Sequence, residues 1–326
     1  MRKGWAFAAL SGALLLAAGC APHFHLDFLG KDKIQEITLL PSKAKEKILV
    51  IDVEGMIGPL GQGGLLDREG DALSRVYYRL EKASMDALVK GVILRLDTPG
   101  GDVTSSDVLT HEIRKFKEKK RLPVVALMMG VAASGGYYVA TACDSIVAHP
   151  STITGSIGVI SVFPNIEGLF AKVGVKTVVI KSGGMKDAGS PFRGMSAEEQ
   201  QIFQEVIDEF YENFLRVVEE RRKDAITREE LRKIADGRIY TAAQALELKL
   251  IDSIGYFDDA LAEVLSRAAL REAKIVAYSY YPKRQTNLYA TALGDAAPLP
   301  QKRIEDVLPA LKSGFYYLWL PHLTND

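Results

Sequence analysis

The strongest constraint on the fold is a repeated alternation of short apolar runs with longer amphipathic stretches. The apolar runs have the length of strands and are rich in Val, Ile and Leu, which is typical of strands buried on both faces of a sheet. Strands that alternate with helices form right-handed crossover units, so we expect an α/β protein with a mainly parallel sheet. The predicted strands lie at the start of 47–58 and in 91–97, 121–130, 144–150 and 176–183, and the predicted helices are 71–89, 104–119, a helix from Ala132 onward, 196–222 and several more within 227–270.

The bulk composition limits the classes of function. The chain has 326 residues, enough for one or two domains, and 48% of them are hydrophobic, enough for a full core. Lysine and arginine number 41, as do aspartate and glutamate, so no charge excess favours a nucleic-acid partner. The two cysteines, Cys20 and Cys143, belong to no Cys/His cluster, so no metal site is expected. Cys143 is interpreted as a small buried residue.

The first twenty residues have the pattern of a bacterial lipoprotein signal peptide. Two basic residues precede an apolar run from Trp5 to Ala18 that is too short for a comfortable membrane span. The run ends in small residues before Cys20 and so resembles the lipobox, in which the cysteine is diacylated, although Ala17 stands where leucine is usual. Cys20 is therefore the predicted lipid anchor. An uncleaved N-terminal anchor and ordinary secretion are the alternatives.

The rest of the chain divides into three parts. Residues 21–45 are polar to mixed and are predicted to be a tether or a first strand. Residues 46–285 contain the strand–helix alternation and are predicted to be the functional domain. Residues 286–326 are predicted to be an irregular tail that ends in GFYYLWLPHL, an apolar run too short to span a membrane. A packed terminal segment is preferred over a lipid contact for this run.

Ser134 is the first candidate for chemistry. It lies among small residues, directly after a predicted strand and at the opening of a predicted helix. Small neighbours let a substrate carbonyl approach the hydroxyl, and the free N–H groups of a helix start favour developing negative charge. The structural alternative is a serine that caps the helix in a Gly/Ala-rich packing site.

The second candidate is the turn Thr98-Pro99-Gly100-Gly101-Asp102. Two glycines after a strand end let the backbone come close to a ligand and present fixed N–H donors, as an oxyanion hole requires. The alternative is an ordinary Pro-Gly turn.

A nucleophilic serine also needs a proton acceptor. The best-placed histidine is His149, although none of the five lies in a small, apolar, glycine-bounded segment. A lysine can serve instead when burial lowers its pKa. Lys181 and Lys186 lie in a loop of small residues, and their spacing does not show which of them would be the base. The alternative is that both are ordinary solvated lysines of a surface loop. Asp187 must point away from Lys186 if Lys186 is the base.

Taken together, these segments resemble the signal peptide peptidases of the SppA type, a Ser–Lys family related in fold to the Clp protease and crotonase groups. The resemblance covers about residues 47–265 and includes a single copy of the motif set, as in the short form of the family. It implies a ClpP/crotonase-like spiral of strand–strand–helix units with a helical C-terminal part. The matching segments are 97–101, 133–138, 154–159, 180–183 with 186–187, and 235–238.

The resemblance also implies roles for individual residues. Ser134 would be the nucleophile and Lys186 the base, with Lys181 the less favoured choice. The N–H groups of Gly101 and Gly135 would form the oxyanion hole, and Ser156 matches a serine that orients the lysine. The family's usual Asn-Ser before Pro-Gly-Gly is Asp-Thr here, a change expected to affect the loop more than the mechanism.

The expected function is that of a serine endopeptidase that degrades apolar peptides, such as cleaved signal peptides, through an acyl-enzyme. It would be lipid-anchored to a membrane of the bacterial envelope, with the catalytic domain outside the cytoplasm. The resemblance suggests homo-oligomeric rings, in which neighbouring subunits share the dyad, and no cofactor. The alternatives are a crotonase-like acyl-CoA enzyme and a catalytically inactive lipoprotein scaffold.

Overall fold

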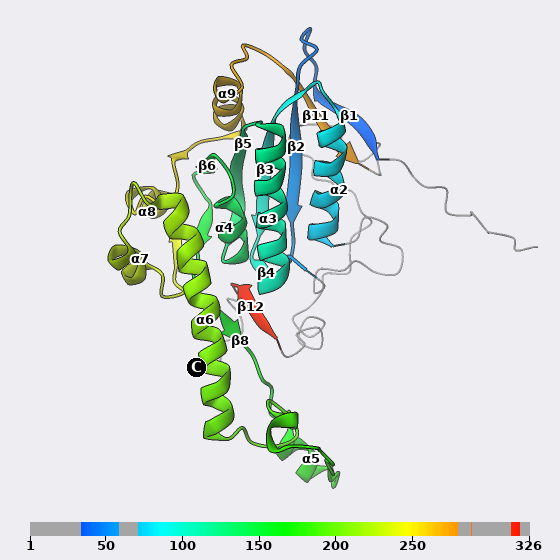
Figure 1. Ribbon diagram of the computed structural model, residues 1–326, viewed down its shortest axis with the longest axis vertical. Helices are drawn as coiled ribbons and strands as arrows, with labels where there is room; N and C mark the ends of the chain where they lie inside the picture. The colour runs from blue at the N-terminus through cyan, green and yellow to red at the C-terminus, as the bar shows by residue number, and fades with distance from the viewer. Residues whose placement is uncertain (1–33, 59–70, 280–287, 289–313, 320–326) are drawn as a thin grey trace, which may run out of the picture. The chain divides into compact units, whose positions relative to one another are not determined.

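The computed structural model describes residues 34–58, 71–279, 288 and 314–319 (Figure 1). Cys20 and the predicted signal peptide lie outside these residues, as does most of the predicted C-terminal tail. No helix within the described ranges combines the length and the apolar character needed to cross a bilayer.

A large sheet, mainly parallel, forms the centre of the described chain. Its path runs β1-β11-β2-β3-β5-β6-β10, and β7 adds to the end of β5 and pairs in turn with β9. The pairs along β11-β2-β3-β5-β6-β10 are parallel, whereas β1 is antiparallel to β11. The predicted α/β class with a mainly parallel sheet is confirmed. The strands are β1 (Gln35–Leu40), β2 (Lys47–Glu54), β3 (Val89–Thr98), β5 (Val124–Ala133), β6 (Ser145–Ala148), β7 (Ile153–Gly155), β9 (Ile239–Thr241), β10 (Ser253–Ile254) and β11 (Lys274–Ser279).

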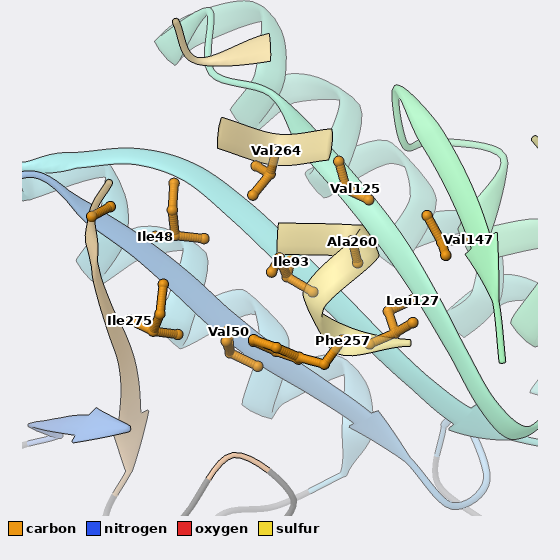
Figure 2. Packing of buried hydrophobic residues seen from close by; sticks show 11 residues of the cluster. Ile48, Val50, Ile93, Val125, Leu127, Val147, Phe257, Ala260, Val264 and Ile275 are labelled. Carbon is orange, nitrogen blue, oxygen red and sulfur yellow. The ribbon is translucent and has the colours of Figure 1, made fainter. Parts of the chain in front are cut away.

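Both faces of the sheet are covered, which explains why its strands are continuously apolar. Successive side chains of a strand point to opposite faces. On one face, Ile48 and Val50 belong to a buried cluster with α9 (Phe257–Arg267), as Figure 2 shows. The intervening Leu49 and Ile51 are equally buried and point to the other face. There α2 (Ala72–Met85) packs against β2 and α3, and α3 (Val103–Lys120) packs in turn against α4 (Gly135–Ala140).

A second, three-stranded sheet lies beside the carboxyl end of β3. It has the order β4-β12-β8, with β12 (Phe315–Leu318) antiparallel to both β4 (Gly100–Asp102) and β8 (Ile160–Ser161) (Figure 1). Residues 315–318 of the predicted irregular tail therefore form a packed strand. The preference for packing over a lipid contact agrees with its buried side chains.

After β8 the chain forms an arm, residues 162–195, before it enters α6 (Ala197–Arg222). The arm contains α5 (Glu167–Lys172) and the 3-10 helix η3 (Gly184–Asp187). The predicted start of α6 is confirmed, because Ser196 and Glu199 form a capping box. The helices α7 (Arg228–Ile234) and α8 (Ala242–Glu247) follow and complete the helical part.

The predicted strand at 176–183 is wrong for the single chain. These residues form no strand and are exposed, with Val178 86% and Ile180 96% accessible. A strand needs a neighbour for its backbone hydrogen bonds, and no described strand of this chain pairs with the segment. The segment has the apolar pattern of a strand, but none of the strands in the described part of the chain pairs with it.

Candidate active site

Ser134 occupies a sharp turn between β5 and α4. Its backbone has φ 53° and ψ −115°, a conformation that costs a non-glycine residue about 1–3 kcal/mol. The turn is held by β7, because the Ser134 N–H donates to the carbonyl of Gly155 (2.8 Å). The Oγ atom makes no capping hydrogen bond to α4 and has no hydrogen-bond partner, although the residue is only 1% exposed. The capping alternative is therefore wrong: the strained turn presents an unpaired hydroxyl.

The predicted oxyanion-hole residues lie next to Ser134. A Cβ atom added to Gly135 would be 3.1 Å from the Gly101 nitrogen, and one added to Gly100 would be 2.7 Å from the Gly135 nitrogen. The backbone of β4 thus approaches the first turn of α4 at a distance that only glycine permits, and Gly100 also has φ +101°. The structure brings Gly101, Gly135 and Ser134 together from two separate elements.

The departure from the family's Asn-Ser pair leaves the turn well supported. The Thr98 hydroxyl accepts a hydrogen bond from the Gly100 N–H (3.1 Å). The Asp97 carboxylate accepts one from the Val131 N–H (3.0 Å) and so ties the ends of β3 and β5 together. Asp102 then caps α3 by accepting from the Ser105 N–H (2.8 Å). The glycine turn is fixed at both ends.

Ser156 lies beside Ser134 through the pairing of β5 with β7. Ala133 is paired with Gly155, so the two serines leave adjacent strands at the same level. The Ser156 N–H donates to the carbonyl of Arg238 (2.8 Å), which places the serine in the wall of an open cleft. This cleft has a volume of about 430 Å³ and is also lined by Val159, Tyr211, Asp236, Leu318 and Trp319, among others.

Lys186 is exposed on η3, and its neighbour Asp187 is engaged elsewhere. The Asp187 carboxylate pairs with Arg193 (2.8 Å) and with Lys181 (2.6 Å). Hydrogen bonds from Arg193 and Lys181 hold the pKa of the Asp187 carboxyl well below its usual value. Asp187 is therefore paired with Lys181 and Arg193. This meets the requirement stated above that Asp187 be turned away from Lys186 if Lys186 is the base. Lys181 forms an ion pair in this state.

The arm does not bring Lys186 to Ser134 within one protomer. Arg193 joins η3 to the first turn of α6 through Glu199, whereas Tyr138 of α4 packs on Phe214 farther along α6. Residues 199 and 214 lie roughly 22 Å apart along the helix axis, at about 1.5 Å of rise per residue. The two predicted members of the dyad are therefore at separate places of the single chain.

The other candidate groups lie outside this site. His149 contacts the Ser151 hydroxyl and the ring of Tyr256 rather than Ser134. Cys143 is buried as predicted, and burial raises the pKa of its thiol to about 12, which makes it unreactive. Over the described part of the chain, no three His, Cys, Asp or Glu residues gather in a way that could hold a metal ion.

Sequence reasoning did not place β12 at this site. Tyr317 of β12 is paired with Gly101, and its ring packs against Tyr138 and Phe214. The one sequence feature that indicated a strand here is the apolar run at 315–320, which has high strand propensity. Its partner could not be read from the sequence, because more than 200 positions separate the two strands.

Comparisons with known proteins identify relatives of this chain. The model of "Peptidase family S49" matches residues 116–271. A putative signal peptide peptidase SppA of Enterococcus faecium is 37% identical over 77% of this chain and 72% of that protein. Protease 4 of Salmonella typhi is 34% identical over 71% of this chain but only 37% of its own length. Among solved structures, the ClpP1 N165D mutant from Listeria monocytogenes matches with a TM-score of 0.42 and 17% identity, over 67% of this chain and 95% of that one. The chain belongs to peptidase family S49, the family of SppA and Protease 4, and is a serine peptidase.

Proposed function

We propose that this peptidase is a membrane-associated endopeptidase that degrades apolar peptides, such as cleaved signal peptides, with a Ser134–Lys186 dyad. The observation that carries the proposal is the buried, unpaired hydroxyl of Ser134 on a strained turn beside the backbone of Gly101 and Gly135. A buried hydroxyl without a partner is costly in a stable core and is best explained by a reaction that uses it.

The reaction would proceed through an acyl-enzyme. Lys186 in its neutral form accepts the proton of Ser134 as Oγ attacks a peptide carbonyl carbon. The negative charge that develops on the carbonyl oxygen is stabilised by the N–H groups of Gly101 and Gly135. The amine product leaves with a proton from the lysine, and a water molecule activated by the same lysine then hydrolyses the ester.

The base would come from a neighbouring copy of the chain. Lys186 is remote from Ser134 in its own protomer but lies on an arm with many exposed apolar side chains. An apolar surface of this kind marks a protein interface. A head-to-tail contact in which each arm reaches the next active site closes into a ring, as the family resemblance suggests. The exposed large apolar residues of the arm are Leu169, Val173, Val175, Val178, Val179, Ile180, Met185 and Phe192.

Lys186 is preferred over Lys181 because of their different contacts. Lys181 donates to Asp187 (2.6 Å) and to the Gly184 carbonyl (2.7 Å), and both bonds hold its amine on its own arm. Asp187 is held by Lys181 and Arg193, which leaves the Lys186 amine to enter a partner's site. Ser156, beside Ser134, would orient the incoming amine.

The membrane association rests on the sequence of the first twenty residues. Acylation of Cys20 would tether the catalytic domain to a membrane of the envelope, outside the cytoplasm. Apolar peptides released at that membrane are the substrates that such a location supplies.

The test uses the purified full chain, a fluorophosphonate probe and an apolar peptide. We expect the probe to acylate Ser134 and the peptide to be cleaved, and both signals to be absent in Ser134→Ala. Ser84→Ala, at a half-buried serine of α2, is the matched control and should behave as wild type. Labelling without cleavage of any peptide would refute the peptidase function and support the inactive scaffold, and turnover of acyl-CoA esters would support the crotonase-like alternative.

A further inference from the structure

We propose that the side-chain hydroxyl of Ser106 is a third donor of the oxyanion hole, beside the N–H groups of Gly101 and Gly135. The inference rests on the function proposed above, because it assigns a further catalytic group to the same reaction at Ser134. Ser106 lies near the start of α3 and so belongs to a different element from both glycines and from the proposed nucleophile.

The first argument is the position of the Ser106 hydroxyl. The helices α3 and α4 pack against each other (Figure 1), and Gly135 at the start of α4 faces Ser106. A Cβ atom added to Gly135 would be 2.5 Å from the Ser106 Oγ atom and 3.1 Å from the Gly101 nitrogen. The hydroxyl and the Gly101 nitrogen therefore border the same small space beside Gly135, where the oxyanion hole is proposed.

The second argument is that the Ser106 hydroxyl has no partner. Ser106 is 0% exposed, and its Oγ atom makes no hydrogen bond. A serine or threonine within a helix commonly donates to the carbonyl one turn earlier. Thr110 of the same helix does so, because its hydroxyl donates to the Ser106 carbonyl (2.8 Å), whereas Ser106 does not. The Ser106 hydroxyl is thus left available to a ligand beside Gly135.

The third argument is where the unpaired groups of the protein gather. In the described part of the chain, four buried side-chain atoms lack a hydrogen-bond partner. Two of the four are the hydroxyl oxygens of Ser106 and Ser134, and both residues adjoin Gly135. Unpaired buried groups are rare in native proteins, and a catalytic role is one of the few reasons for them. Their meeting at one glycine indicates that the reaction, and not the fold, uses both hydroxyls.

Packing alone does not account for a serine at position 106. The close approach of Gly135 favours a small side chain there, but alanine would meet this requirement without leaving a hydroxyl unpaired. A buried hydroxyl that lacks a partner lowers stability, because it has lost its bonds to water and gained none in return. This cost is explained if the hydrogen bond of Ser106 forms only during the reaction.

The proposed hydrogen bond belongs to the transition state. As the Ser134 Oγ atom bonds to the carbonyl carbon, the π electron pair of the C=O bond moves onto the oxygen, which becomes negatively charged. Serine side chains can stabilise such an oxygen together with backbone N–H groups. The Ser106 hydroxyl donates to it, and this bond weakens when the C–N bond breaks and the carbonyl re-forms. An interaction made only in the transition state raises kcat and leaves KM unchanged.

The experiment compares Ser106→Ala with wild type in the full chain by cleavage of an apolar peptide. We expect kcat to fall by roughly 10- to 100-fold, at the lower end of the loss caused by removing one oxyanion donor, with KM unchanged. The urea midpoint of unfolding should not fall, because the variant loses no side-chain hydrogen bond of the folded protein. Ser105→Ala is the matched control. The neighbouring hydroxyl lies next to Gly58, so kcat should stay at the wild-type value.

A peptide aldehyde supplies the second readout. It adds to the Ser134 hydroxyl and forms a tetrahedral adduct whose oxygen takes the position of the reacting oxygen. Its Ki should therefore rise in Ser106→Ala by the same factor by which kcat/KM falls. Ser106→Cys nearly keeps the shape of the side chain but replaces the hydroxyl by a weak donor, and it should resemble Ser106→Ala.

The outcomes separate this inference from the proposed function. Wild-type kcat and aldehyde Ki in Ser106→Ala would overturn the role of Ser106 while the peptidase function stands. A fall in kcat together with a lower urea midpoint and an unchanged aldehyde Ki would also overturn it, because position 106 would then act through packing. If wild type cleaves no peptide, the proposed function is refuted. The rate of fluorophosphonate labelling at Ser134 then decides the role of Ser106, which slower labelling of Ser106→Ala supports and equal labelling overturns.

Discussion

The groove around Ser134 and the arm that carries Lys186 have opposite physical character. In the groove, Ser134, the proposed nucleophile, and the glycine backbone are buried, tied to three strands and fixed by hydrogen bonds. On the arm, Lys186 and most of the apolar side chains around it are exposed, and the segment before it has strand-like sequence without a paired strand. The surroundings of Ser134 are formed within a single chain, whereas Lys186, the other member of the predicted dyad, is exposed on the surface.

This difference indicates that the proposed oligomer would be needed to bring the base to the serine. A buried apolar groove is stable in a monomer, but an exposed apolar arm is unfavourable in water until a second surface covers it. The arm is nevertheless not loosely attached, because Arg193 bridges Asp187 of η3 and Glu199 of α6. The arm is therefore a fixed projection, as the proposed contact with another copy would require.

The largest expected effect comes from removing the base. Lys186→Ala should lower kcat by roughly 100- to 10,000-fold, the range that a positioned general base contributes. If the dyad is shared, mixing Lys186→Ala with Ser134→Ala subunits should restore about a quarter of wild-type activity, because one interface in four then pairs an intact serine with an intact lysine. Peptide cleavage by the dissociated and reassociated mixture measures this.

Two results would separate the possible arrangements. If the mixture stays as inactive as either variant alone, Lys186 does not act on a neighbouring Ser134. The exposed arm would then have no role in catalysis at the next subunit. Lys181→Ala is the matched control on the same arm. It should cost less than Lys186→Ala, since Lys181 supports Asp187 rather than the reaction.

The second prediction compares a glycine-to-alanine substitution in the groove with one in the arm. Gly100→Ala places a Cβ 2.1 Å from the Tyr317 oxygen and 2.7 Å from the Gly135 nitrogen, at φ +101°. It should lower kcat on the order of 100-fold by displacing the oxyanion donors, and lower the free energy of unfolding by about 1–3 kcal/mol. In the arm, a Cβ at Gly168 of α5 meets nothing within 4 Å, so Gly168→Ala should be neutral or slightly stabilising. Peptidase assays and urea unfolding of both variants give the comparison.

The sequence predicted the groove better than the arm, for a physical reason. Ser134, the glycine turn and Ser156 lie at the ends of buried strands, and buried strands have a strong apolar pattern and a predictable common edge. At 176–183 the same kind of pattern predicted a strand wrongly, because a strand needs a paired neighbour and no strand among residues 34–58, 71–279 and 314–319 pairs with it. Strand propensity describes how a segment packs and not where its neighbour is.

The strand β12 was missed as part of the site for a related reason. The described part of the run GFYYLWLPHL, residues 314–319, is packed as predicted, but its pairing with β4 joins residues that are far apart in the sequence. Likewise, the ion pairs that occupy Asp187 could not be known in advance. The sequence showed that Asp187 had to point away from Lys186, and the structure supplied Lys181 and Arg193 as its partners.

A third prediction addresses the apolar surface of the arm. Ile180 is 96% exposed, so Ile180→Glu should leave the fold of the protomer unchanged. If the arm contacts a neighbour, the buried charge should dissociate the oligomer and reduce activity at least about tenfold. Light scattering and peptidase assays measure the two effects. Met85→Glu, at a residue 77% exposed on α2, is the matched control and should change neither the mass of the particle nor the activity.

The smallest expected effect concerns the attachment of the arm to α6. Hydrogen bonds from Arg193 and from the Ser196 N–H lower the pKa of Glu199 to about 2, and Arg193 and Lys181 lower that of Asp187. Because these carboxyls bind protons more weakly when folded, their contribution to stability is complete above the ordinary glutamate pKa of 4.5 and is lost as pH falls through the folded value. The thermal midpoint of wild type should therefore fall more steeply between pH 4.5 and about 2 than that of Glu199→Gln. Glu198→Gln, the neighbouring control, should follow wild type, and identical profiles for all three proteins would show that the cluster does not fix the arm.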